Sequence, residues 1–274
     1  MAPVKLSPSA LSTWVDCRRK YRYTYLERQP RGRAMAHFSL GNSVHAVLRD
    51  FVAPIDEPDL IENLLEKHWQ TAGYRDADMS EAIKSLALVW LTQYCENEGE
   101  ISAVAVERTV SYTIGDVVLS GRIDRLDQRK IDGKRELVVV DYKTGSSAPT
   151  SQEAKSSLAL AFYAVAAWRQ YAQECVQVEL HHLPTGTRAV ARHTNESLAR
   201  HRDRILSIVD EIVEARKARP DDETVFTPSP SRLCAYCDFR ALCPEGEALT
   251  PAVEPWAAVE HLEAEALELG LHPR

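Results

Sequence analysis

The chain has 274 residues, of which 45% are hydrophobic, and a formal net charge of −7 at pH 7. This length and composition suit one large domain with a buried core, and they exclude a disordered chain or a small disulfide scaffold. No apolar run approaches the roughly 20 residues that a membrane span needs, and the start lacks the apolar stretch of a signal peptide. We therefore expect a cytoplasmic protein with no membrane partner.

The first hundred residues are predicted to be mainly helical. Residues 7–26 indicate one helix, because Ser7 or Ser9 can cap it, Pro8 suits a first turn, and apolar residues follow at helical spacing. Helical spacing also recurs over residues 43–52, 59–71 and 80–98.

The second part of the chain changes to extended segments. Residues 103–114, 117–126 and 136–142 are rich in β-branched side chains and predict an antiparallel sheet. A helix over 158–171, a hairpin over 176–183 and 188–193, and a long amphipathic helix over 196–216 follow. The pattern near the end predicts an acidic helix over 253–269, as a loosely docked tail. The fold class is therefore α/β.

Two carboxylates are expected to face each other across a hairpin. Asp132-Gly133 is a strong two-residue turn signal, and in such a hairpin the numbers of paired residues share a constant sum. Asp124 and Asp141 have the same sum as the two turn residues, so they would be directly opposed. Two like charges at that separation are destabilising unless a cation lies between them. A longer turn or a bulge would shift this register.

A lysine joins the two carboxylates on one face. Side chains alternate along a strand, so Asp141 and Lys143 point to one side and Tyr142 to the other. Carboxylate oxygens suit magnesium or manganese, and Lys143 could stabilise charge that develops on a phosphate. The alternative is a surface hairpin with an ordinary Asp–Lys ion pair.

A basic segment near the start offers a surface for a nucleic-acid backbone. Basic residues interleave here with Tyr21, Tyr23 and Tyr25, a mixture that suits phosphates and bases. The basic residues are Arg18, Arg19, Lys20, Arg22, Arg28, Arg31 and Arg33. A solvated helix face explains the same pattern equally well. The negative net charge is no obstacle, because the chain from Pro244 onward carries seven glutamates against Arg274 alone.

Three of the six cysteines are closely spaced. Cys234, Cys237 and Cys243 form a C-x2-C-x5-C cluster, and Cys17 is a candidate fourth ligand. Thiolate sites serve both zinc and iron-sulfur clusters, so spacing separates the two poorly. Without further information, a structural zinc site is the favoured interpretation. Cys95 and Cys175 are expected to be ordinary buried thiols.

The segment from Gly121 to Arg125, followed by Val140 to Gly145, resembles the core signature of RecB-like PD-(D/E)XK nucleases. This branch includes helicase-coupled and CRISPR-associated exonucleases. The resemblance implies a restriction-endonuclease-like core, metal ligation by Asp124 and Asp141, and catalytic support by Lys143. The segment Gly41 to His45 resembles an upstream Gly-x-x-x-His element, whose histidine reaches the same metal.

Other residues match the family pattern less completely. Tyr163 matches a tyrosine on a helix that borders the DNA, but Ala159 stands where the family has glutamine, which puts the glutamine's role in doubt. Glu107 could supply a further oxygen ligand, although a surface glutamate is at least as good an interpretation. The resemblance also changes the expectation for Cys17, Cys234, Cys237 and Cys243, which match a set that holds a 4Fe-4S cluster, with zinc as the less favoured alternative.

The resemblance divides the chain into four parts. These are a helical N-terminal region over 1–100 with Cys17 and His45, a nuclease core over 101–220, a cysteine segment over 221–246 and an acidic tail over 247–274. The implied function is a metal-dependent DNA exonuclease acting on single-stranded ends in DNA repair or recombination, with a helicase or recombination partner. Two alternatives are a CRISPR-associated exonuclease of spacer acquisition and a non-catalytic DNA-binding subunit.

Overall fold

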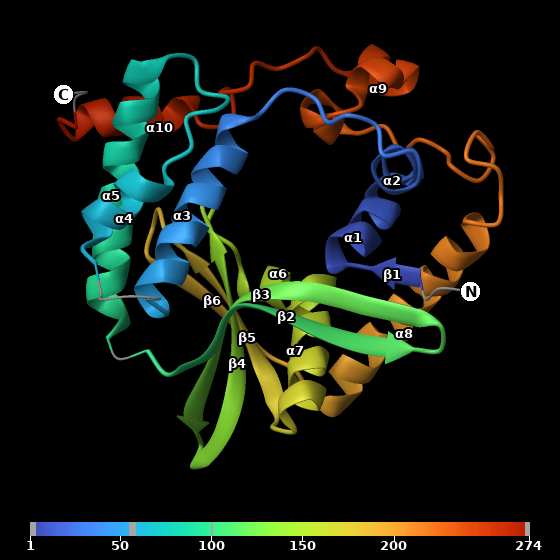
Figure 1. The fold of residues 1–274 in the computed structure, drawn as a ribbon, viewed down its shortest axis with the longest axis horizontal. Helices are drawn as coiled ribbons and strands as arrows, with labels where there is room; N and C mark the ends of the chain where they lie inside the picture. Colours follow the sequence, from blue (N-terminus) through green and yellow to red (C-terminus); the bar gives the residue numbers. More distant parts are fainter. Residues whose placement is uncertain (1–3, 55–58, 100, 272–274) are drawn as a thin grey trace.

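One mixed sheet organises the molecule. The computed structural model describes residues 4–54, 59–99 and 101–271, so the predicted boundary at residue 100 and the last three residues of the predicted tail lie outside them. Six strands in these ranges form the sheet, with helices on both sides (Figure 1). The strands are β1 (Val4–Leu6), β2 (Ala103–Ile114), β3 (Val117–Ile131), β4 (Lys134–Lys143), β5 (Cys175–His182) and β6 (Thr187–Arg192).

The sheet is antiparallel where the sequence predicts it. The order is β1-β3-β4-β5-β6, and β2 pairs with the other edge of β3. Both the meander β2-β3-β4 and the hairpin β5-β6 are antiparallel. Two pairings are parallel, β1 with β3 and β4 with β5, and the second needs a crossover. Helices α6 (Ser151–Ser156) and α7 (Leu158–Tyr171) provide that crossover.

The predicted hairpin register is confirmed. Asp132-Gly133 forms the turn, and the pairs run from Ile131 with Lys134 to Arg125 with Val140, all with the predicted sum. The turn works because Asp132 and Gly133 both adopt positive φ angles, of 48° and 83°.

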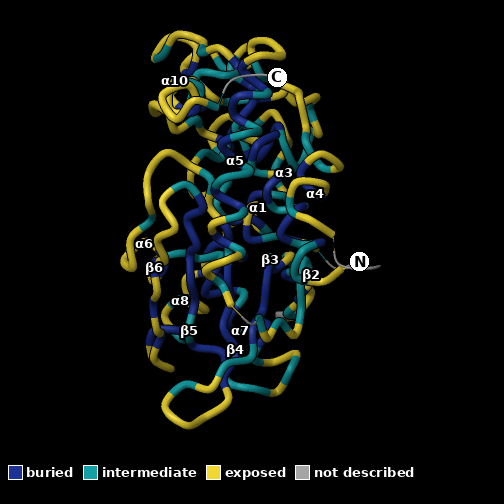
Figure 2. The backbone as a smooth tube through the Cα atoms, turned by 90° about the vertical axis from the view of Figure 1, so that its left-hand side faces the viewer, coloured by how far each residue is buried: buried dark blue, intermediate teal, exposed yellow. Residues whose placement is uncertain are grey.

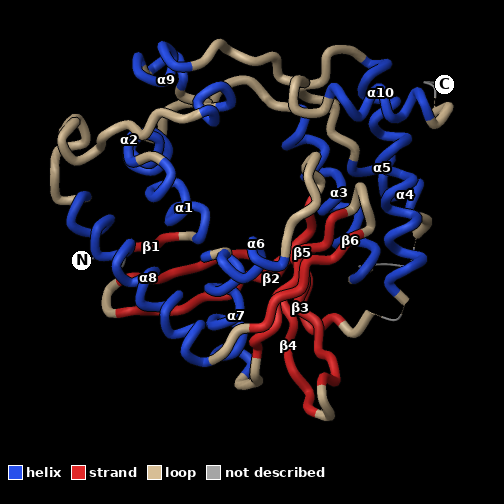
Figure 3. Tube along the Cα trace, turned by 180° about the vertical axis from the view of Figure 1, so that it is seen from behind, coloured by secondary structure: helices blue, strands red, loops and turns tan. Residues whose placement is uncertain are grey.

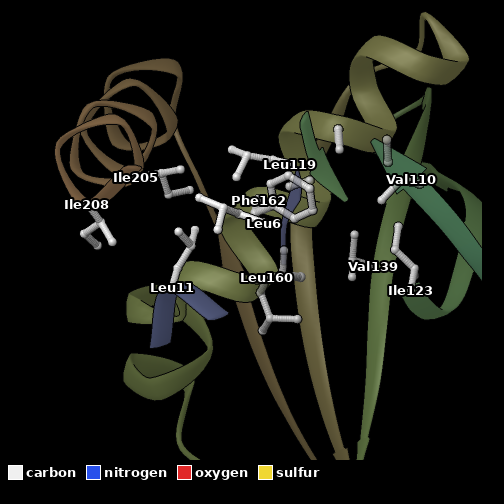
Figure 4. Close-up of a cluster of buried hydrophobic side chains, with 14 of the residues drawn as sticks. Leu6, Leu11, Val110, Leu119, Ile123, Val139, Leu160, Phe162, Ile205 and Ile208 are labelled. Carbon is white, nitrogen blue, oxygen red and sulfur yellow. The ribbon is translucent and has the colours of Figure 1, made fainter. Parts of the chain in front are cut away.

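Two hydrophobic cores cover the two faces of the sheet. The first lies under α1 (Pro8–Asp16), α7 and α8 (Asn195–Ala215), and Figure 4 shows part of it. The second lies under α3 (Ala36–Val52), α4 (Ile61–His68) and α5 (Ala77–Glu98), which are seen beside the sheet in Figure 3. Strand β4 contributes Leu137 and Val139 to the first core and Val138 and Val140 to the second. Its continuous apolar run is therefore buried on both faces, as Figure 2 shows in dark blue.

The prediction of one helix over residues 7–26 is wrong. Helix α1 begins as expected, since the Ser7 side chain accepts a hydrogen bond from the Ala10 amide and Pro8 stands in the first turn. It ends at Cys17, whose backbone is extended (φ −163°, ψ 112°). A second helix, α2 (Arg18–Tyr21), restarts there and continues into the π-helical turn η1 (Arg22–Leu26). The Cys17 Sγ atom accepts from the Lys20 amide at 3.4 Å and so caps the second helix.

The helix of the acidic tail is shorter than predicted, and it is docked on the protein. Within the predicted helix over 253–269 only α10 (Glu260–Glu268) is helical, because Pro255 disfavours a helical conformation at Glu254 and residues 255–259 form turns. Leu262 and Ala266 are buried in the second core against α5, and Glu263 forms two bonds to Arg75, at 2.6 and 3.0 Å. The cysteine segment before it contains η2 (Arg232–Tyr236), η3 (Arg240–Leu242) and α9 (Pro244–Leu249). In the described ranges, no helix has the length and apolar character of a membrane span.

Candidate metal and nucleic-acid site

The candidate site lies where β3 changes neighbours. Along one edge of β3, β1 pairs with Val117 to Leu119 and β4 pairs with Arg125 to Ile131, so residues 120–124 between them pair with no described strand on that edge. Gly121 lies in this stretch, and a Cβ atom there would stand 2.7 Å from the Tyr163 ring and 2.9 Å from Pro8. Glycine is therefore what allows α1 and α7 to approach β3 so closely.

Three carboxylates lie on three neighbouring strands. The pairs Val106 with Arg125 and Arg108 with Ile123 set Glu107 level with Asp124. On the other side, the β3–β4 ladder ends at Arg125 with Val140, so Asp124 and Asp141 are the next residues beyond its last pair. Glu107 has a positive φ of 47°, a left-handed conformation that costs about 1–2 kcal/mol for a non-glycine residue. Strain of this kind is typical of functional positions.

His45 of α3 completes a group that fits a divalent cation. One ligand atom each from His45, Glu107 and Asp124 lies within 4.8 Å of the others. The His45 Nε2 atom lies 3.2 Å from the Tyr142 carbonyl, which can only accept, so Nε2 carries a proton and Nδ1 faces the Asp124 carboxylate at 3.4 Å. A histidine ligand that donates its other N–H to a backbone carbonyl is the usual arrangement at protein metal sites.

The charges around His45 and Glu107 are unbalanced without a cation. Burial disfavours the His45 imidazolium, but the hydrogen bond and charge of Asp124, with Asp141 and Glu107, outweigh burial and raise its pKa. Burial and then the charge of Asp124 raise the pKa of Glu107. Arg122 partly compensates, since its Nε atom lies 2.7 Å from Glu107. The group therefore attracts protons, and a divalent cation would meet the same electrostatic need.

Asp141 lies beside this group and contacts Lys143. The Lys143 Nζ atom forms an ion pair with Asp141 Oδ2, on the face that strand alternation predicts. Burial raises the pKa of Asp141; Lys143 opposes this rise, whereas Asp124 adds to it. The amide of Tyr142, the residue between Asp141 and Lys143, donates a hydrogen bond to Asp124 Oδ2 at 3.0 Å. Glu107 therefore stands in the His45–Asp124 group where the sequence favoured Asp141, and the role of Asp141 as a ligand stays a prediction.

A buried ionic network supports the site from the other face of the sheet. Arg125, next to Asp124, is completely buried and donates to Glu98 at 3.0 Å and to Asp127 at 3.1 Å. Its other terminal nitrogen donates to the hydroxyl groups of Tyr94 and Tyr142, both at 3.2 Å. Because Tyr142 also contacts Asp124 and His45 through its backbone, this network fixes the strand that carries the site.

A cleft of about 810 Å³ opens over Glu107 and Asp124. Helix α1 and helix α3 form its sides, and β2, β3 and α7 contribute to its lining; Figure 1 shows α1 and α3 on either side of the molecule's centre. Tyr163 and Ala159 line it together with His45 and Asp124. Burial, with the charges of Asp141 and Asp124, raises the pKa of Tyr163 to about 12, so its hydroxyl stays protonated. The DNA-binding role of Tyr163 stays a prediction.

The four cysteines singled out in the sequence line one cavity. Cys17, Cys234, Cys237 and Cys243 surround a space of about 290 Å³. Gly246 borders them, and a Cβ atom there would stand 3.5 Å from the Sγ atoms of both Cys234 and Cys243.

Much of the predicted basic segment is engaged inside the protein. Arg19 and Arg22 are buried, and they form ion pairs with Glu245 at 2.5 Å and Glu27 at 3.0 Å. Arg18 pairs with Glu211 at 2.6 Å. The segment therefore holds the cysteine region and α8 in place, and only part of it is left for a nucleic acid.

The sequence contains a signal that relates Glu107 to Asp124. Gly115-Asp116 is the two-residue turn between β2 and β3, and Glu107 and Asp124 share the sum of its residue numbers. The arithmetic that opposed Asp124 to Asp141 would thus have opposed it to Glu107 as well. No comparable signal marks the burial of Arg125.

Comparison with known proteins identifies one protein family. Residues 5–244 match the model of the PD-(D/E)XK nuclease superfamily. No curated protein matches the chain. Among solved structures 25 chains match, including one described as "Crystal structure of SSO0001", which is 14% identical, with a TM-score of 0.43 over 88% of this chain and 87% of that chain. At this identity and TM-score the likeness says nothing about function.

Proposed function

The chain belongs to the PD-(D/E)XK nuclease superfamily, and from that premise we propose that it is a DNA exonuclease that uses magnesium or manganese and acts on single-stranded ends. The observation that carries the catalytic part is the His45, Glu107 and Asp124 group, with its ligand atoms within 4.8 Å of one another, beside the Asp141–Lys143 pair. Hard oxygen ligands with one imidazole suit these two cations.

His45, Glu107 and Asp124 would hold the cation, with Asp141 adjacent. A bound divalent ion supplies charge neutralisation at the phosphate and activation of a water. The protein's own contribution is preorganisation, since the Tyr142 amide fixes Asp124 and the Tyr142 carbonyl fixes the tautomer of His45. Lys143 would donate a charge-assisted hydrogen bond to a phosphate oxygen and stabilise the charge that develops there.

The cleft supports a polyanionic substrate that passes over the carboxylates. Arg49 and Arg122 line it, together with the amides of Asn42 and Gln70, so phosphates would meet cationic and polar side chains. The exonuclease mode, the preference for single-stranded ends and the setting in repair or recombination follow from the family resemblance and belong to the proposal.

We further propose that Cys17, Cys234, Cys237 and Cys243 hold a 4Fe-4S cluster, with zinc as the alternative. The fit rests on the shared cavity, on Gly246 at its wall and on two amides near sulfur. The amides of Lys20 and Ser231 donate to Cys17 Sγ and Cys234 Sγ, each at 3.4 Å. Hydrogen bonds to the ligand sulfurs are a usual feature of iron-sulfur sites. Such a cluster would stabilise the contact between the α1–α2 region and the cysteine segment.

A cleavage assay tests the proposed reaction. End-labelled single-stranded and duplex DNA would be incubated with the protein in magnesium, manganese or chelator, and we expect shortening of the single strand only with metal. Closed circular single-stranded DNA is the matched control, because an exonuclease needs an end. Cleavage of the circle would replace the exonuclease proposal with an endonuclease. Binding without cleavage in every metal would instead favour a non-catalytic DNA-binding subunit.

A further inference from the structure

Helix α3 presents one face to the cleft, and an exposed aromatic residue lies near the N-terminal end of this helix. Phe38, Asn42, His45 and Arg49 recur at helical spacing and all line the cleft, whereas the opposite face is buried in the second core. Phe38 is 59% exposed. It is the only exposed one of the chain's five phenylalanines, all of which lie in the described ranges.

A second ring lies against Phe38, and a third ring lies against the second. The ring of His37 lies 4.2 Å from that of Phe38, between centroids, and is inclined by 45° to it. Tyr236, from the cysteine segment, meets His37 edge to face at 6.2 Å and is itself 40% exposed. Burial lowers the pKa of His37, which leaves it uncharged at neutral pH. This aromatic platform, Phe38, His37 and Tyr236, therefore offers ring faces and no extra positive charge.

We propose that the aromatic platform stacks an unpaired base of a DNA single strand whose backbone passes over the His45–Glu107–Asp124 group. The inference rests on the proposed function and names how its substrate is selected. Phe38 precedes His45 by seven residues, about 10 Å along the helix. A strand held at His45 would therefore bring a base a few nucleotides away to the part of the platform that lines the same cleft, Phe38 and His37.

The platform favours single strands for a physical reason. Every base has a face that can stack on an aromatic ring, but in a duplex both faces are covered by neighbouring bases. An exposed ring can therefore engage only an unpaired base or the end of a duplex. Arg49 and Arg122 pair through Nε with Asp50 and Glu107, and their terminal nitrogens would hold phosphates of the same strand. These cationic side chains distinguish the cleft from an apolar surface that binds a protein segment.

The test measures binding without cleavage. A fluorescent oligothymidylate would be titrated with protein in chelator, for the wild type, Phe38→Ala, Phe38→Trp and Leu60→Ala, where Leu60 is a 71% exposed residue outside the cleft. Loss of one stacked base should weaken binding at least about fivefold in Phe38→Ala. Phe38→Trp should restore the affinity, and Leu60→Ala should leave it unchanged.

A strand with abasic sites identifies the contact. The wild type should bind it less tightly than the intact strand, whereas Phe38→Ala should bind both equally, because the substitution and the abasic sites remove the same interaction. Equal affinity of wild type and Phe38→Ala for the intact strand would overturn the platform. An equal loss in Phe38→Ala on both strands would also overturn it, since the effect would then be unrelated to the base.

The same proteins, supplied with manganese, separate this inference from the proposed function. If the wild type cleaves DNA and Phe38→Ala binds as tightly as the wild type, only the platform fails. If the wild type cleaves no DNA but shows the base-dependent loss, the platform stands and the nuclease proposal fails.

Discussion

Replacing Glu107 by glutamine should stabilise the metal-free protein. Glu107 and Asp124 offer carboxylate oxygens within 4.8 Å, and both side chains are largely shielded, with exposures of 17% and 15%. Two unit charges at that distance repel by about 3.5 kcal/mol at an effective dielectric constant of 20. The nearby Arg122 and solvent reduce this repulsion, so we expect a gain of about 1–2 kcal/mol in the free energy of unfolding, or a few degrees in Tm.

The same substitution should weaken metal binding, because it removes one ligand. For the wild type, a cation at 100 times its Kd adds about 2.7 kcal/mol of stability, and this gain should shrink in Glu107→Gln. Thermal melting in chelator and in graded manganese, at pH 8, measures both effects. Arg122→Gln is the matched control, which should destabilise the metal-free protein and keep the manganese shift. A Glu107→Gln protein that melts no higher in chelator and shows an unchanged manganese shift would refute the assignment.

Four further outcomes are expected. Lys143→Ala should lower the cleavage rate by about 100-fold or more, while the manganese shift in Tm remains. Asp141→Ala is tested in the same cleavage assay, and wild-type cleavage by this variant would show that Asp141 is not part of the active centre. In chelator, the raised pKa of His45 contributes stability that is fully present below about pH 6.5 and is lost as the pH rises through the folded-state pKa. Tm should therefore fall as the pH rises from about 6.5 through that pKa, and a Tm that stays constant would contradict this prediction. Leu262→Ala should cost about 2–5 kcal/mol because Leu262 is 3% exposed, whereas Leu269→Ala, at 60% exposure, should change little; equal effects would mean that α10 is not docked. Protein prepared without oxygen should be brown from iron-thiolate charge transfer and should lose this colour in Cys17→Ala, and stoichiometric zinc without iron would exclude the cluster.

The sequence by itself determined the centre of the sheet. A two-residue turn fixes the pairing on either side as far as the first bulge, so Asp132-Gly133 sufficed to set the register up to Arg125 with Val140, with Asp124 and Asp141 as the next residues. Strand alternation then placed Lys143 beside Asp141 and turned Tyr142 to the other face. These are local rules, which hold whatever surrounds the strands. The family signature lies in the same short stretch, which is why the family could be identified from it.

Only the tertiary structure decided which distant side chains meet there. The position of His45 against Tyr142 and Asp124 depends on how α3 packs on the second core, and no local pattern encodes that packing. The docking of α10 is also a tertiary property: its acidic residues predicted a loose tail, but Leu262 is buried. The burial of Arg125 likewise depends on partners from two other elements. The sequence pattern also did not predict the helix break at Cys17, because helical spacing continues through that residue. The extended backbone of Cys17 occurs where it lines the cavity shared with the cysteine segment. Packing between elements sums many weak contacts over long sequence separations, whereas turns and strand parity act within a few residues.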